Sequence, residues 1–120
     1  MTTMATRFLN PFESLRVPGI VGKVAHTYSA QLIAQQGQDF IQIMQAELEP
    51  GKYGFGYHLS LSGRKYLQNP GEGQGWFRSP DDALMYALGH IRARSHLLPQ
   101  HFTFAIDAAI RNLQTRSLFD

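Results

Sequence analysis

The chain of 120 residues contains no cysteine. This absence excludes a disulfide framework, a thiolate-ligated zinc site, an iron–sulfur cluster and a cysteine nucleophile. It also fits a reducing compartment, so we expect a cytoplasmic protein. Long apolar runs are lacking as well, because no stretch approaches the roughly 20 apolar residues that a membrane-spanning helix needs. We therefore expect no membrane association.

A strong excess of one charge is also missing. The sequence has 11 Lys and Arg against 9 Asp and Glu, which gives a net charge of +2. This balance is compatible with nucleic-acid binding but does not indicate it. The charges are unevenly placed: residues 1–60 carry four basic and four acidic side chains, whereas residues 83–119 carry four arginines against Asp107 alone. The C-terminal part is therefore the cationic part.

What is present suits a folded domain. Hydrophobic residues make up 43% of the sequence and charged residues 17%, a composition typical of a globular protein. The length suits one domain that can bury its own core. Two prolines and little periodicity predict a loose N-terminal arm over residues 1–19, with an anchoring turn near Phe12 to Leu15. We expect a single α+β domain over residues 20–120.

The segment Tyr53 to Leu61 carries the clearest strand pattern. Large apolar side chains alternate with Gly54, Gly56, His58 and Ser60, which predicts a strand with one buried face. Glycines on the second face allow another element or a ligand to come close. We expect a helix packed across this glycine face, with a ligand as the alternative.

Residues 26–48 fit two structures. Apolar and polar residues alternate from His26 to Gln35, with Tyr28, Ala30, Leu32 and Ala34 on one side. Gly37-Gln38-Asp39 is typical of a turn, so residues 26–48 can form a hairpin. A single long helix is the alternative, because several apolar residues share one helical arc and the composition favours helix. Gly37 would lie inside that helix, and we therefore favour the hairpin.

The remaining pattern predicts a loop, a short strand and two helices. Gly63 to Gly75 is rich in turn residues and is expected to be a loop, followed by a short strand at 76–78. Ser79 is a helix N-cap followed by proline and two aspartates. The first helix buries Leu84, Leu88 and Ile91, with Ala83 and Ala87 flanking them, and stops at Pro99. A second helix runs from about Thr103 to Arg116 with Ile106, Ala109, Ile110 and Leu113 inward. We predict an α+β fold, an antiparallel meander of three or four strands followed by two helices packed on one face.

No catalytic, metal or cofactor site emerges from the motifs. Asp81 and Asp82 fit the first turn of a helix better than a facing acid–base pair. The run Gly71 to Gly75 lacks the helix and the Lys-Ser/Thr of a phosphate loop. The histidines lack metal-ligand spacing. A binding module is therefore favoured over an enzyme, a small-molecule enzyme with a pocket at His58 stays as a third hypothesis, and no cofactor is expected.

Basic and aromatic residues support two binding hypotheses. The first is a non-enzymatic module that contacts nucleic acid through Arg64, Lys65, Arg78, Arg92 and Arg94, since arginines and lysines contact phosphates and aromatics stack on bases. The alternative is a protein-interaction or assembly subunit in which Tyr66 and Trp76 contact a partner. An exposed sheet edge and many aromatics favour a homodimer.

The order of elements resembles a known family. Strands followed by Trp76-Phe77, a turn and the helix pattern from Ser79 to Ile91 resemble the strand–strand–strand–helix core of HicB-type antitoxins over residues 40–95. The sequence around Trp76 lacks that family's aspartate–proline type of strand motif. Residues 97–120 do not match a ribbon-helix-helix or helix-turn-helix module. The resemblance implies the order of elements and no functional residue.

Overall fold

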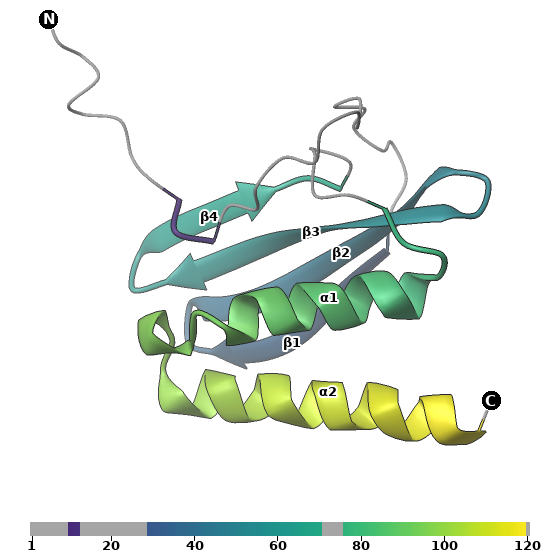
Figure 1. The fold of residues 1–120 in the computed structure, drawn as a ribbon. Helices are drawn as coiled ribbons and strands as arrows, with labels where there is room; N and C mark the ends of the chain where they lie inside the picture. The colour runs from purple at the N-terminus through teal and green to yellow at the C-terminus, as the bar shows by residue number, and fades with distance from the viewer. Residues whose placement is uncertain (1–9, 13–28, 71–75, 120) are drawn as a thin grey trace, which may run out of the picture.

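The computed structural model describes residues 10–12, 29–70 and 76–119. Four strands form one antiparallel sheet in the order β1-β2-β3-β4, and two helices follow (Figure 1). The elements are β1 (Ser29–Gln36), β2 (Asp39–Glu49), β3 (Lys52–Leu61), β4 (Arg64–Gln68), α1 (Pro80–Arg92), the short 3₁₀ helix η2 (Ser95–Leu97) and α2 (Gln100–Phe119). This confirms the predicted α+β fold, with four strands in the meander.

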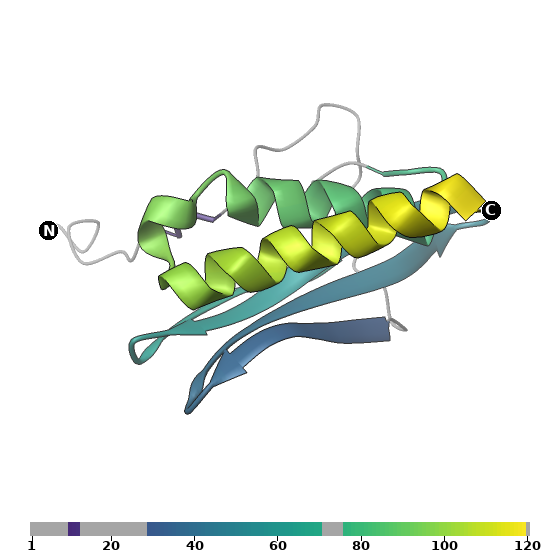
Figure 2. The same ribbon diagram turned by 90° about the horizontal axis from the view of Figure 1, so that it is seen from below.

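Both helices lie on the same face of the sheet (Figures 1 and 2). The core forms between this face and the helices, because alternate residues of the two central strands point toward α1. Its members include Ile41, Ile43, Phe55, Tyr57 and Leu59 from the sheet, Ala83, Leu84, Ala87, Leu88 and Ile91 from α1, and Phe102, Ile106 and Leu113 from α2. Every α1 residue predicted to be inward is buried.

The hairpin prediction for residues 26–48 is confirmed within the described residues. β1 and β2 are joined at Gly37, whose φ of 60° is the left-handed conformation that glycine adopts at no steric cost. The predicted single-sided alternation of β1 is wrong, however. A bulge between Leu32 and Ala34 shifts the register, so Leu32 pairs with Gln42 and Ala34 with Ile41 on the opposite face. Leu32 is consequently 56% exposed on the face away from the helices.

The loop predicted from Gly63 to Gly75 is wrong for its first part, which forms β4. Ser62 and Gly63 have φ values of 53° and 83°, and two successive positive φ values are typical of the tight turn that suits the twist of a hairpin. The antiparallel pairing of β3 with β4 then extends from the pair Leu61–Arg64 to the pair Tyr57–Gln68. The turn chemistry of Ser62-Gly63 outweighs the polar composition of the segment.

The expected helix over the glycine face is also wrong, since the helices cover the other face. The chain's own backbone approaches there instead. A Cβ added at Gly56 would lie 2.7 Å from the backbone nitrogen of Pro70 and would clash with the carbonyl oxygen of Gln68. Gly54 lies against the side chain of Leu48, with 2.9 Å to its nearest atom. The glycines therefore make room for segments of the same chain.

The start of α1 follows the prediction and its end does not. The Ser79 hydroxyl accepts a hydrogen bond of 3.0 Å from the backbone N–H of Asp82, so Ser79 is the N-cap. The helix ends at Arg92, well before Pro99. Arg94 donates to the carbonyl of His90 at 2.7 Å, and such a bond to a last-turn carbonyl stabilises a helix end. α2 is longer than predicted, because it already begins at Gln100.

The strand predicted at 76–78 is only a single bridge. The backbones of Tyr53 and Phe77 exchange two hydrogen bonds, of 2.8 and 2.7 Å. Of the N-terminal arm predicted over residues 1–19, the structure describes only Asn10–Phe12, so the rest of that prediction lies outside the described residues. Neither described helix is long and apolar enough to cross a membrane.

Candidate functional site

The five residues predicted to contact nucleic acid do not form one cluster. Figure 1 shows the β3–β4 turn, with Arg64 and Lys65, at the same end of the molecule as the C-terminal end of α1, with Arg92 and Arg94. Arg78 precedes the N-terminal end of α1 and lies at the opposite end. Four of the five residues therefore share an end of the fold.

Two of these four make structural contacts. The Nε of Arg92 lies 2.7 Å from the carboxylate of Asp107, which joins α1 to α2 and compensates the charge of Arg92. Arg94 donates to two backbone carbonyls, those of His90 and Pro11. Both of these partners are neutral carbonyl groups. Arg64 and Lys65 are exposed at the start of β4.

Exposed aromatic side chains also lie near the start of β3. We call this region the Trp76 patch; it consists of two contacting pairs, Lys52 with Trp76 and Phe77 with Tyr86. Trp76 is 45% exposed and Tyr86 is 51% exposed. The ring of Phe77 lies 5.1 Å from that of Tyr86, and the Nζ of Lys52 lies 5.0 Å from the centre of the Trp76 ring. A cation at this distance from an indole face is attracted to it.

The patch is held in position by the sheet and by the core. The bridge between Tyr53 and Phe77 fixes the segment that carries Trp76. Phe55, which is fully buried, supports both Phe77 and Tyr86, at ring distances of 6.2 and 5.6 Å. The rings of Phe77 and Tyr86 therefore rest on the hydrophobic core, which restricts their motion.

Acidic groups balance the charge next to the patch. The Nζ of Lys52 is 3.4 Å from a carboxylate oxygen of Glu49. A hydrogen bond to Glu47, together with the negative charge of that residue, raises the pKa of Tyr53 above its ordinary value. These surroundings lack the net positive charge that phosphate contacts require.

The sequence pattern indicated Trp76 but neither Tyr86 nor Lys52. Tyr86 lies on the outward side of α1, and an aromatic on the polar side of an amphipathic helix was the available signal. Lys52 had no signal, because its contact with Trp76 depends on the bridge at Phe77. Tyr66, predicted to bind a partner, is only 9% exposed and packs against Phe12 at 5.3 Å. The partner-binding prediction therefore rests on Trp76.

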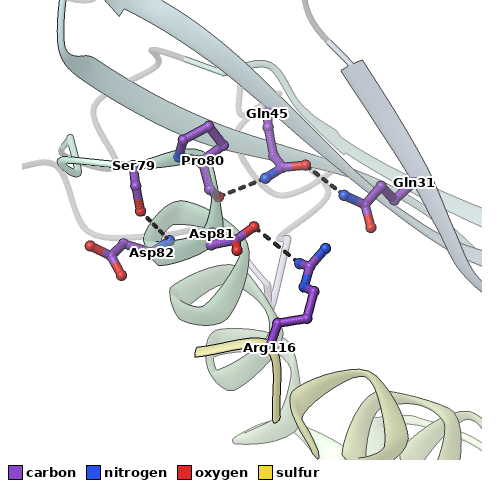
Figure 3. A network of polar contacts seen from close by, with 7 residues as sticks. All are labelled: Gln31, Gln45, Ser79, Pro80, Asp81, Asp82 and Arg116. Atoms are coloured by element: carbon purple, nitrogen blue, oxygen red, sulfur yellow. Dashed lines mark hydrogen bonds and ion pairs between the residues drawn. The ribbon is translucent and has the colours of Figure 1, made fainter. Parts of the chain in front are cut away.

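A buried glutamine positions the N-terminal end of α1 (Figure 3). Gln45, which is 5% exposed, donates a 2.6 Å hydrogen bond to the carbonyl of Pro80 and accepts one of 2.9 Å from Gln31. Asp81 binds Arg116 of α2 at 3.1 Å. The network ties β1, β2 and both helices together at one end of α1, and it places Arg78 and the preceding patch segment relative to the sheet.

The described residues offer exposed surfaces for binding. In the part of the chain that the structure describes, no three histidine or acidic side chains are grouped so that they could hold a metal ion. Asp81 is engaged with Arg116, and Ser79 caps α1. Comparisons with known protein families, curated proteins and solved structures found no match for this chain. The resemblance to HicB-type antitoxins thus extends no further than the order of elements.

Proposed function

We propose that this protein is a non-enzymatic assembly module that binds a second copy of itself through the Trp76 patch. The observation that carries the proposal is the exposure of Trp76, next to the backbone bridge at Phe77, and of Tyr86, whose ring contacts that of Phe77. Tryptophan, tyrosine and arginine dominate the binding energy of protein interfaces, and Arg78 follows the patch in sequence. Rings that rest on the core lose little side-chain entropy on binding, which favours association.

The charges of the patch suit a symmetric pair. Lys52 and Glu49 lie side by side with opposite charge, so the Lys52 of one copy can face the Glu49 of the other. A two-fold interface brings the same surface of both copies together. A surface with balanced charge avoids the repulsion that a uniformly basic surface would cause in such a pair.

The test is the oligomeric state of variants, measured by light scattering during size-exclusion chromatography over a range of concentrations. We expect the wild type to be dimeric, and Trp76→Ala and Tyr86→Ala to weaken the dimer by about 2 kcal/mol or more each, as for a central interface aromatic. Phe104→Ala is the matched control, because Phe104 is an equally exposed aromatic (60%) on α2, outside the patch.

Two outcomes would contradict the proposal. A wild type that stays monomeric at all concentrations would exclude self-association. A dimer that persists in Trp76→Ala but dissociates in Leu32→Lys would place the interface at the edge strand β1, whose residues Ser29–Gln36 carry no charge that would deter strand pairing.

Nucleic-acid binding is our second candidate function, favoured by the shared location of Arg64, Lys65 and Arg94 at one end of the fold. We expect fluorescence anisotropy to detect salt-sensitive binding of a labelled single-stranded oligonucleotide. The double variant Arg64→Ala, Lys65→Ala should reduce the slope of log K against log salt by about 0.7 for each phosphate that it no longer neutralises. Arg111→Ala, an exposed arginine on α2, is the control. Absence of binding at low salt would rule this candidate out.

A further inference from the structure

The segment Asn10–Phe12 lies well before the sheet in the sequence but packs closely against it. Phe12 is only 1% exposed, although the described residues around it are only Asn10 and Pro11. Its ring meets Tyr66 at 5.3 Å and Tyr57 at 6.5 Å, both edge to face. Such aromatic pairs add to the hydrophobic gain of burying the ring.

Side chains of the domain also bind the backbone of this segment. The carbonyl of Phe12 lies 2.6 Å from Nε2 of His90, and the carbonyl of Pro11 accepts a 2.8 Å hydrogen bond from Nε of Arg94. Asn10 donates to the hydroxyl of Tyr57 at 2.9 Å. These contacts link residues separated by 47 to 83 positions in the chain.

The segment is also pre-shaped for these contacts. The side-chain oxygen of Asn10 accepts a 2.9 Å hydrogen bond from the backbone N–H of Phe12. This turn places two consecutive carbonyls and one aromatic ring toward the domain. Side chains that recognise carbonyls, together with a buried aromatic anchor, are how protein surfaces bind short peptides.

We propose that Tyr57, Tyr66, His90 and Arg94 form a peptide-binding site that the chain's own Asn10-Pro11-Phe12 occupies. We call it the Phe12 site. Its ligand class is a short peptide with an asparagine, then a residue with an accessible carbonyl, then phenylalanine. In the full chain an external peptide must compete with the attached segment, whose effective concentration is in the millimolar range for a short tether. The site has no residue in common with the Trp76 patch, so each proposal has a test of its own.

The test measures competition between the attached segment and a free peptide. The probe is a fluorescein-labelled peptide with the sequence of residues 8–14, and the control peptide carries alanine in place of Phe12. We expect the full-length variant Phe12→Ala to bind the probe at least about tenfold more tightly than the wild type, because its own segment no longer competes. Adding Arg94→Ala to this variant should weaken probe binding, and the control peptide should not bind.

A Phe12→Ala chain that unfolds cooperatively but binds the probe no better than the wild type would overturn the proposal. Equal binding of probe and control peptide would do the same. If Phe12→Ala does not fold, Asn10→Ala takes its place, because it keeps the aromatic anchor and removes only the bonds to Tyr57 and within the turn. We expect Asn10→Ala to bind the probe several-fold more tightly than the wild type, and no change would refute the site.

Discussion

His90 illustrates how one side chain can join two parts of the molecule. Its ring contacts the Phe12 carbonyl, lies beside Arg94 and stacks on Tyr86 at 6.5 Å with an angle of 17°. Burial lowers the pKa of His90 below its ordinary value of 6.5, and the charge of Arg94 adds to this effect, while the bond to the Phe12 carbonyl opposes it. The folded protein therefore holds His90 in its neutral form.

This pKa shift predicts how stability depends on pH. As the pH falls below 6.5, the unfolded chain takes up a proton at His90 while the folded chain does not, so the free energy of unfolding decreases until the lower folded pKa is reached. We expect His90→Gln to flatten this part of the curve, measured by thermal unfolding between pH 5 and 8. Its side-chain amide can still donate to the Phe12 carbonyl. Identical pH dependence in both proteins would contradict this assignment.

At the same scale, two neighbouring arginines differ in what they do. Arg92 neutralises Asp107 across the two helices. Arg94 binds the end of α1 and the segment at Pro11. The sequence placed both arginines in the cationic C-terminal part and did not distinguish them, because Asp107 and Pro11 are both more than ten residues away along the chain.

At the scale of elements, glycines decide how closely segments pack. Gly56 lies under the backbone of Gln68 and Pro70. We expect Gly56→Ala to destabilise the protein by about 1–3 kcal/mol, since backbone atoms cannot move aside as a flexible side chain can. Chemical denaturation monitored by circular dichroism measures this decrease in stability.

Gly89 provides the matched control for this prediction. It lies inside α1 with no atom within 4 Å of an added Cβ. Gly89→Ala should stabilise the protein by about 0.5–1 kcal/mol, because alanine loses less backbone entropy in a helix. Equal effects of the two substitutions would mean that the approach of residues 68–70 to the sheet is not close enough to matter.

Elements with strong local signals were predictable from the sequence. The Ser79 cap, the inward face of α1 and the alternation of β3 depend on residues within one or two turns of each other. β4 was missed because it has only five residues without polar–apolar alternation, and its ladder to β3 depends on the turn at Ser62-Gly63. The bulge in β1 likewise leaves no local mark that the alternation could reveal.

At the scale of the whole molecule, a contact between Tyr86 and His90 connects the two proposed binding surfaces. Tyr86 belongs to the Trp76 patch and its ring stacks on His90, which belongs to the Phe12 site. Between them, Phe55 contacts both rings from within the core. The two sites thus share a packed aromatic cluster, although each proposal has its own test.

The sequence by itself determined the α+β class, the order of strands and helices, the capped start of α1 and the absence of cysteine chemistry. These properties follow from composition and from interactions between near neighbours in the chain. Only the tertiary structure decided that the glycine face receives residues 68–70, that Lys52 contacts Trp76 and Tyr86 contacts Phe77, and that Phe12 docks against Tyr57 and Tyr66. The physical reason is that these contacts join segments far apart in sequence, and no periodicity or local propensity encodes which distant side chains meet.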